Sequence, residues 1–212
     1  MDVYCERLSD GFWAEPLNAV SNVAFLVAAL LLWVRHRPRP RSLRALPVLL
    51  ALVGLGSLTF HTFATPATST LDVGFIAVYV LWYLVCFAHW FLGVRWRWAW
   101  VAVPAFVVLA VVTGPVAGLL PRGSGAYVAP WLALVILTVV AAVRGQRWRE
   151  LAWAAGVFVV SLTLRTLDEP LCGVWPSGTH YFWHLLNAVV LYLVAVGITR
   201  QVTPPVRAAD RT

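Results

Sequence analysis

The stretch from Thr179 to Ile198 reads T-H-Y-F-W-H-L-L-N-A-V-V-L-Y-L-V-A-V-G-I, an apolar run long enough to cross a membrane as a helix. Two histidines, His180 and His184, stand at its start. Residues four apart lie on one face of a helix, so both imidazoles point the same way. That pairing favours a metal site. A lone membrane histidine more often bonds a neighbouring helix, so metal binding needs partners elsewhere in the chain.

The composition is that of an integral membrane protein rather than a soluble domain with a large core. Of the 212 residues, 61% are hydrophobic and only 12% are charged. The formal net charge of +7 is spread over loops between apolar runs, which argues against nucleic-acid binding. Because the spans need almost every residue, we expect one domain over residues 1–200 and a polar cytoplasmic tail over 201–212.

Seven apolar segments predict an all-α bundle of seven membrane-spanning helices. The expected spans cover about 16–34, 46–63, 70–94, 96–119, 127–143, 151–164 and 180–198. The sixth is short, but Arg149 and Arg165 can extend it because their side chains reach toward the interface. Gly114 and Pro115 predict a break or kink in the fourth span. Outer turns and loops are expected over 62–70, 123–127 and 168–178.

The arginines set the expected orientation, because positive residues gather on the cytoplasmic side of a membrane. Most of them fall on one side of the predicted spans: Arg35, Arg37, Arg39, Arg41, Arg44, Arg95, Arg97, Arg144, Arg147, Arg149, Arg200, Arg207 and Arg211. The other side has Arg7, Arg122 and Arg165. We therefore expect the N-terminus outside and the C-terminus in the cytoplasm. Asp2 and Glu6 stand where a cleavable signal has basic residues, so the first span is expected to carry the N-terminus across.

This orientation brings five polar side chains to one depth near the outer interface. They come from the end of the second span and the starts of the third and seventh: Ser57, His61, Asp72, His180 and His184. Three neutral imidazoles and a water form a zinc site with an open position, which is the catalytic pattern. Asp72 also has a plainer role as a helix N-cap or first-turn carboxylate. A nearby zinc ion would offset the cost of a charged carboxylate at that depth.

The ordered motifs of the chain resemble those of the alkaline ceramidases. The motifs are C-E-R at 5–7, E-P-L-N-A-V-S-N at 15–22, G-S-L-T-F-H at 56–61, L-D-E-P-L-C at 167–172 and H-Y-F-W-H at 180–184. Asp72 follows His61 by eleven residues. No single motif is specific, but the set covers most of the chain in matching order and spacing. These ceramidases belong to a wider superfamily of seven-span membrane hydrolases that includes the adiponectin and progestin receptors.

The resemblance implies a set of site residues: zinc ligands His61, His180 and His184, with Ser57 and Asp72 as the companion polar pair. It also implies a disulfide between Cys5 and Cys172, which are both expected on the outer side, where such bonds persist. The implied activity is hydrolysis of a lipid amide, ceramide to sphingosine and fatty acid. The absence of lysine and the short loops favour a bacterial source. We therefore expect the inner membrane, with the active site toward the periplasm.

The resemblance further implies calcium, which alkaline ceramidases bind through acidic residues and an asparagine around the first cysteine. Glu6 and Glu15 match two of those ligands in this chain. Two other ligand positions depart from the family, because Val3 and Leu8 stand there. The loop to Glu15 is also two residues shorter, and the available substitutes are Asp2 and Asp10. A hard cation needs several oxygen ligands, so calcium depends on such a substitute.

The expected mechanism uses zinc to activate water and polarise the scissile carbonyl of ceramide or another N-acyl lipid. Asp72 would take the water proton and pass it to the leaving amine. Ser57 would donate a hydrogen bond to the developing oxyanion.

Two other classes of protein remain open at this point. One is a receptor-like lipid-binding protein on the same seven-span scaffold, with a structural zinc and little hydrolysis. A lipid hydrolysis assay separates that class from an enzyme. The other is a b-type cytochrome with histidines as axial haem ligands, although such ligands usually face each other across a bundle. A Soret band in the absorbance spectrum would identify it.

Overall fold

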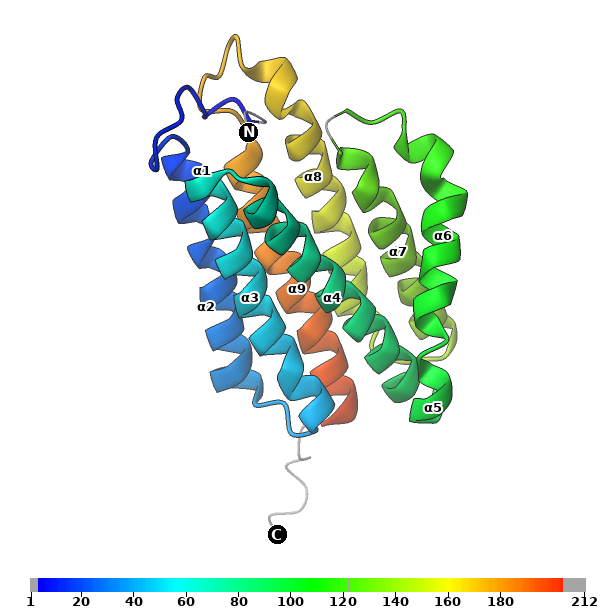
Figure 1. The fold of residues 1–212 in the computed structure, drawn as a ribbon. Coiled ribbons are helices and arrows are strands. Elements are labelled where there is room, and N and C mark those ends of the chain that lie inside the picture. Colours follow the sequence, from blue (N-terminus) through cyan, green and yellow to red (C-terminus); the bar gives the residue numbers. More distant parts are fainter. Residues whose placement is uncertain (1–3, 122, 204–212) are drawn as a thin grey trace.

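The computed structural model describes residues 4–121 and 123–203, which form an upright bundle of helices (Figure 1). Seven helical segments are long and apolar enough to cross a membrane, and the described residues contain no strand. The predicted all-α fold with seven spans is therefore confirmed. The seven apolar helices suggest an integral membrane protein, whereas the orientation of the chain stays a prediction.

Four of the seven segments are single helices, and the other three are composite. The single helices are α3 (Arg41–Phe63), α4 (Pro66–Trp90), α8 (Arg149–Leu171) and α9 (His180–Val202). The first segment comprises α1 (Pro16–Ser21), α2 (Val23–Leu31) and a π-helical turn, η1 (Leu32–His36). The fourth and fifth comprise α5 (Trp96–Ala99) with α6 (Ala102–Ala117), and the 3₁₀ helix η2 (Ser124–Tyr127) with α7 (Val128–Val143).

The connection between α3 and α4 is shorter than the turn predicted over 62–70. It consists of two residues, and the first, Ala64, adopts a left-handed conformation with φ 48°. Thr65 then caps α4 in a reciprocal hydrogen-bond pair with Thr68, and Pro66 occupies the first helical turn. Asp72 consequently lies in the second turn of α4, so the predicted cap or first-turn role of this carboxylate is wrong.

Two further predicted boundaries are also wrong. The loop predicted from residue 168 begins only after Leu171, because Asp168 is helical and just 3% exposed. Gly114 and Pro115 do not break the fourth span, since α6 continues through them to Ala117, whereas the kink predicted as the alternative stays a prediction. The predicted tail over 201–212 cannot be compared in full, because α9 extends to Val202 and residues 204–212 lie outside the described residues. Other residues used in the predictions also lie outside them: Asp2, Val3, Arg122, Arg207 and Arg211.

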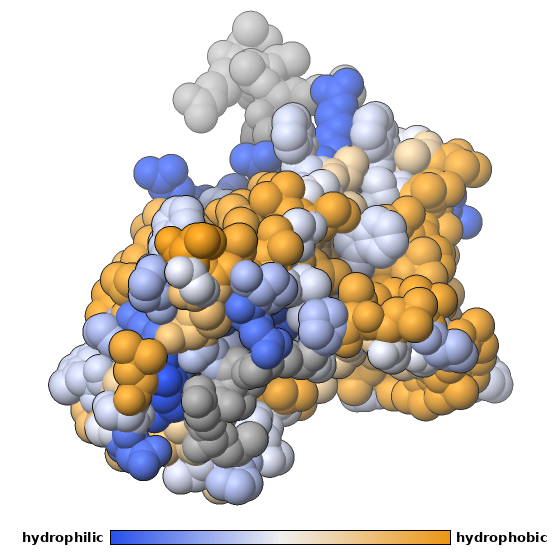
Figure 2. Space-filling view, turned by 90° about the horizontal axis from the view of Figure 1, so that it is seen from above, coloured by the Kyte–Doolittle hydropathy of each residue, from blue (hydrophilic) through white to orange (hydrophobic). Residues whose placement is uncertain are grey.

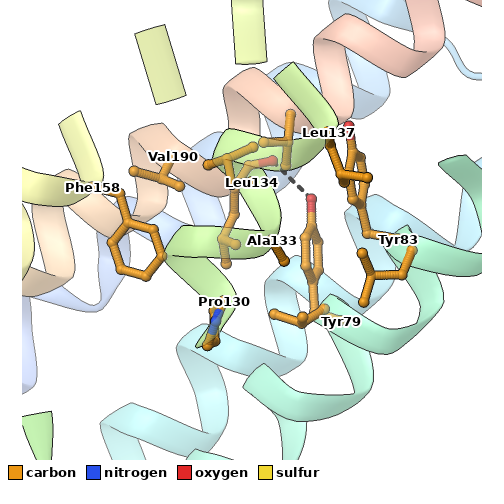
Figure 3. A pocket seen from close by; sticks show the side chains of 12 residues that line it. Tyr79, Tyr83, Pro130, Ala133, Leu134, Leu137, Phe158 and Val190 are labelled. Atoms are coloured by element: carbon orange, nitrogen blue, oxygen red, sulfur yellow. Dashed lines mark hydrogen bonds between the residues drawn. The ribbon is translucent and has the colours of Figure 1, made fainter. Parts of the chain in front are cut away.

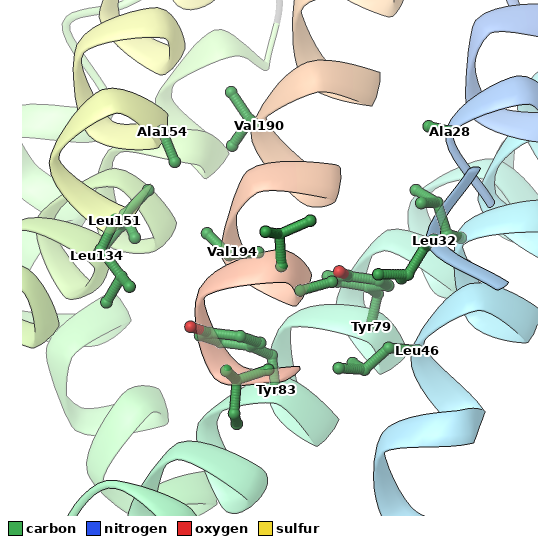
Figure 4. Close-up of a cluster of buried hydrophobic side chains, with 14 of the residues drawn as sticks. Ala28, Leu32, Leu46, Tyr79, Tyr83, Leu134, Leu151, Ala154, Val190 and Val194 are labelled. Atoms are coloured by element: carbon green, nitrogen blue, oxygen red, sulfur yellow. The ribbon is translucent and has the colours of Figure 1, made fainter. Parts of the chain in front are cut away.

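Helix α9 is the centre of the bundle and α6 is at its edge. Of the most apolar window in each span, 56% is buried for α9 and only 6% for Trp96–Ala117. α9 contacts α1, α2, α3, α4 and α8. Figure 4 shows Val194 of α9 between Leu151 of α8 on one side and Leu32 of η1 on the other. Because α9 contacts five other helices, side chains from those helices can meet beside it.

The outer flank of the bundle is apolar, as expected for a surface in contact with lipid. Val111 and Val112 of α6 are 71% and 69% exposed, and Trp153 of α8 is 71% exposed. In the end-on view of Figure 2, hydrophobic residues cover much of the visible surface, and many hydrophilic residues gather on one side of it. A water-exposed surface of this kind is rare in soluble monomers. The exposed apolar flank therefore agrees with the membrane-protein composition of the chain.

Cys5 and Cys172 lie at disulfide distance, with their Cα atoms 5.3 Å apart. The predicted pairing is thus compatible with the structure. The bond ties the N-terminal segment to the end of α8, across a sequence separation of 167 residues. It closes the same end of the bundle at which α9 begins (Figure 1).

Removal of this bond by Cys5→Ser is expected to lower the free energy of unfolding by about 2–4 kcal/mol, because the unfolded chain gains conformational freedom. Thermal unfolding of the purified protein in detergent, with and without reductant, measures the change. Wild-type protein should lose stability on reduction, and the variant should not respond. The third cysteine, Cys86, is buried and unpaired, so Cys86→Ala should respond to reductant as wild type does. An equal reductant response of Cys5→Ser would contradict the pairing.

Candidate metal centre

Three histidines from two helices meet inside the bundle. His61 lies near the end of α3, and His180 and His184 are one turn apart at the start of α9. All three are at most 2% exposed. One ligand nitrogen from each ring lies within 4.8 Å of the other two. Within the part of the chain that the structure describes, this is the one group of His, Cys, Asp and Glu side chains close enough to hold a metal ion.

The start of α9 is held in place by Asp168, whose carboxylate acts as a cap from the neighbouring helix α8. Its Oδ1 accepts hydrogen bonds from the backbone N–H groups of Thr179 (2.7 Å) and His180 (2.9 Å). A carboxylate is favourable at a helix N-terminus, where N–H groups have no partner in the helix. Gly178 has φ 65°, and a Cβ there would meet Asp168 Oδ1 at 2.1 Å. Asp168 therefore sets where the first ligand of α9 is placed.

Two of the three imidazoles have a side-chain oxygen as the hydrogen-bond partner of their Nδ1 atom. His61 Nδ1 lies 2.5 Å from Glu15 Oε2, and His184 Nδ1 lies 2.7 Å from Ser21 Oγ. Metal-ligating histidines usually donate their second ring N–H to such a partner, which fixes the tautomer and the ring orientation. The remaining nitrogen of His61, Nε2, is buried and has no hydrogen-bond partner. These residues fit a metal ion bound through Nε2.

His180 is positioned differently from the other two. Its ring stacks on Tyr4, with centroids 3.7 Å apart, and Nη1 of Arg165 lies 3.4 Å from its Nδ1. A guanidinium only donates hydrogen bonds, so this long contact does not select the tautomer that ligates through Nε2. Stacking on Tyr4 and the backbone bond to Asp168 are therefore the interactions that orient this ring.

Glu15 is a buried carboxylate that contacts three other side chains of the site. It is 2% exposed and forms an ion pair with Arg7, in addition to its contacts with His61 and Asn18. Burial alone would raise the pKa of Glu15, but the three hydrogen bonds outweigh burial and hold this pKa below its ordinary value. The carboxylate is thus an anion that faces both an imidazole and a guanidinium.

The structure does not fit the predicted calcium site. Both oxygens of Glu6 accept backbone N–H groups, from Leu17 at 2.7 Å and Asn18 at 2.8 Å. Both oxygens of Glu15 also accept hydrogen bonds, one of them from Arg7. Calcium needs six to eight oxygen ligands, and here the oxygens face N–H donors. Of the expected substitutes, Asp10 is exposed to solvent and Asp2 lies outside the described residues.

Ser57 and Asp72 lie beside the histidines, as predicted. Ser57 is one turn before His61 on α3 and is 3% exposed. Asp72 projects from α4, and both residues line one pocket together with His184. Oδ1 of Asp72 is buried and has no hydrogen-bond partner. The five residues predicted from their common depth therefore come together.

The pocket beside the histidines adjoins a second, apolar pocket. The two share lining residues from α4, α7, α8 and α9: Val80, Pro130, Phe158, Val190 and Leu191. Figure 3 shows the second pocket, with Phe158 and Val190 facing Tyr79 and Tyr83. Tyr79 donates a hydrogen bond to the backbone oxygen of Leu191 at 2.7 Å, so its hydroxyl is satisfied. The wall that the two pockets share is therefore apolar and lies next to the polar residues beside the histidines.

The sequence did not identify the partners that hold the imidazoles. The Glu15 to His61 contact joins residues 46 positions apart, and the Ser21 to His184 contact joins residues 163 apart. Neither spacing forms a local motif. The sequence also predicts a loop at Asp168, and the twelve positions that separate Asp168 from His180 are too many for a local capping motif.

Glu15→Gln should lower zinc affinity by about 10- to 100-fold, because the neutral amide no longer stabilises the ligand tautomer of His61. Competition with a chromogenic zinc chelator measures the affinity of the purified protein. Glu6→Gln is the matched control, since Glu6 caps α1 and bonds backbone N–H groups there. If both variants lose affinity equally, packing of the N-terminal segment rather than the Glu15 to His61 bond is responsible.

Comparison with known proteins does not assign a family. No protein-family model matches the chain, and no curated protein matches it significantly. The likeness to alkaline ceramidases therefore stays a prediction from ordered motifs. What the structure adds is a buried three-histidine cluster, next to a serine and an aspartate, in a bundle of seven apolar helices.

Proposed function

We propose that the protein is a zinc-dependent amidohydrolase that cleaves the N-acyl bond of ceramide or a similar membrane lipid amide. One observation carries the proposal. Three buried imidazoles converge with an unpartnered Nε2 on His61, and one of them, His184, lines a pocket together with Ser57 and Asp72. A purely structural metal site has no need for an open, polar side that adjoins an apolar pocket.

Zinc is the ion that this ligand set favours. Neutral imidazoles suit borderline metals such as zinc, whereas calcium and magnesium prefer oxygen ligands. Three histidines leave a fourth, open position, as in catalytic zinc sites. The chemistry that zinc supplies in such a site is a water nucleophile at neutral pH and a polarised carbonyl.

The residues of the chain would move the protons and hold the substrate. Asp72 has an unpartnered carboxylate oxygen in the pocket, so it is the base that would take the proton from the attacking water and give it to the leaving amine. Ser57 would donate its hydroxyl to the oxyanion. His61, His180 and His184 would hold the metal, and Glu15 and Ser21 would keep two of these rings oriented.

A lipid amide is the substrate that the surroundings favour. Apart from Ser57, Asp72, Tyr127, His184 and Asn187, the pocket beside the histidines is lined by apolar and tryptophan side chains. The second pocket is apolar apart from the hydroxyls of two tyrosines. An acyl chain would bury apolar area there at about 25 cal/mol per Å². With the predicted orientation, the reaction takes place near the outer, periplasmic face of a bacterial inner membrane.

The geometry favours zinc over the haem alternative. A haem between two histidines needs its porphyrin ring to lie between the two imidazoles. The three ring centroids here are only 4.7–5.2 Å apart, which leaves no space for a macrocycle between any pair. The receptor-like alternative keeps the zinc but not the reaction, and the two experiments below separate it from the enzyme.

His180→Ala should abolish both zinc binding and lipid hydrolysis, because it removes one of three ligands. Metal analysis of the purified protein and mass spectrometry of ceramide incubated with it provide the two measurements. His89→Ala is the matched control, because His89 bonds the backbone of Val94 at the other end of α4. Full turnover by the His180→Ala variant would contradict the proposal.

Asp72→Asn should keep zinc and lose about 10²- to 10⁴-fold in the rate of hydrolysis, since the amide cannot accept the water proton. The measurement is release of fatty acid from the same lipid, with zinc content determined on the same sample. Wild-type protein that binds zinc and ceramide but releases no fatty acid would favour the receptor-like alternative instead.

A further inference from the structure

A separate pocket, lined by charged residues, lies at the opposite end of the bundle from the histidines. It has a volume of about 730 Å³ and is located where the first span joins α3. Its lining includes four arginines: Arg35, Arg37, Arg39 and Arg44. Arg44 is 17 positions before His61 on α3, which corresponds to about 25 Å along the helix. The pocket is therefore distinct from the candidate metal centre.

The backbone that presents these arginines is short and conformationally restricted. The segment 35–41 reads R-H-R-P-R-P-R, and only residues 37–40 separate η1 from α3. Each proline fixes its φ angle, and Pro38 is buried. Arg37 adopts a left-handed conformation with φ 41°, which residues other than glycine seldom adopt. The arginines are thus held in one arrangement rather than on a long loop.

Two of the guanidinium groups are also fixed by hydrogen bonds to this backbone. Nε of Arg37 donates to the oxygen of Val34 at 3.1 Å, and Nε of Arg44 donates to the oxygen of Pro38 at 3.2 Å. A guanidinium has five N–H donors, so each group keeps further donors for a ligand. Paired N–H groups in a planar fork match the oxygens of a phosphate.

The positive charge of the pocket is not balanced by its own lining, in which the described residues include no carboxylate. At this end of the described chain Glu150 is already paired, with Arg147 at 2.8 Å and Arg200 at 3.3 Å. Four guanidinium groups around one pocket repel one another and concentrate a positive potential. An anion in the pocket would relieve that repulsion.

The position of the pocket indicates a lipid rather than a soluble anion. Its wall includes Trp33 and Val34, which are 50% and 51% exposed at the end of a span. Tryptophan is enriched at the depth of lipid headgroups, and arginines there attract anionic lipid. The apolar part of the wall can contact the glycerol and the first acyl carbons, while the guanidinium groups face a phosphate.

We propose that this pocket binds the phosphate headgroup of an anionic phospholipid. General attraction of a positive surface to the membrane is a different property, because any arginine at this end contributes to it. A specific binding site differs from this attraction in two ways: it selects one headgroup, and its affinity depends on the arginines that line the pocket. Both differences can be measured on the full chain.

The experiment compares lipid binding to two double variants of the purified protein in neutral detergent. Arg35→Gln with Arg39→Gln removes two charges from the pocket. Arg95→Gln with Arg97→Gln removes two exposed charges beside α5, at the same end of the bundle (Figure 1). Native mass spectrometry and thermal shift measure binding of phosphatidylglycerol, phosphatidylcholine and inorganic phosphate.

The expected result is that phosphatidylglycerol binds and stabilises the wild type more than phosphatidylcholine does. The pocket variant should bind it about 30-fold more weakly, equivalent to about 2 kcal/mol for two arginines near charged lipid. The control variant should bind as wild type does. Zinc content serves as the test of folding, because neither pair of arginines lines the pocket beside the histidines.

Three outcomes would overturn the proposal. If both double variants lose affinity equally, the attraction is diffuse and the pocket is not a specific binding site. If phosphatidylcholine binds as well as phosphatidylglycerol, the arginines do not select an anion. If inorganic phosphate stabilises the wild type as strongly as the lipid does, the ligand is a soluble anion and the lipid assignment is wrong.

Discussion

The structure depends on one constraint: three imidazole rings are buried together inside the bundle, each at most 2% exposed. In a membrane, every buried polar group needs a partner from the protein or a bound ligand. Glu15 and Ser21 provide such partners for His61 and His184 at 2.5 Å and 2.7 Å. His61 Nε2 is left without one. A metal ion that binds all three rings would satisfy this nitrogen and unite α3 with α9.

This constraint explains why the N-terminal segment folds back over the end of the bundle. Tyr4 stacks on His180, Arg7 pairs with Glu15, and Glu15 reaches His61, so residues from before the first span surround the histidines. The bond between Cys5 and Cys172 fixes this segment to α8. Arg7 also explains how a buried carboxylate is tolerated without a divalent cation, since its guanidinium balances the charge of Glu15 directly.

Hydropathy predicted the spans because a membrane helix has to be apolar along its length, whatever its neighbours are. The prediction that span ends lie at one depth in the membrane placed His61 and His184 together for the same reason. The prediction of a loop from residue 168 was wrong, because apolar character alone ended the sixth span before the helix itself ends. The structure instead uses the carboxylate of Asp168 to cap α9 at two N–H groups. Pairings such as Glu15 with His61 depend on how helices pack laterally, and no sequence spacing encodes that.

Two polar atoms of the site lack a hydrogen-bond partner, and they bear directly on its chemistry. His61 Nε2 and Asp72 Oδ1 are both buried without a hydrogen-bond partner, on two different helices. Each such group costs about 1–3 kcal/mol when it stays unpaired. A metal ion at the first and a water or amide proton at the second would remove both penalties at once. Both atoms belong to residues of the site, and Asp72 and Ser57 line the same pocket as His184. A protein that only stored a metal ion would gain nothing from leaving Oδ1 of Asp72 unpaired, so this oxygen supports the proposed role of the carboxylate as a base.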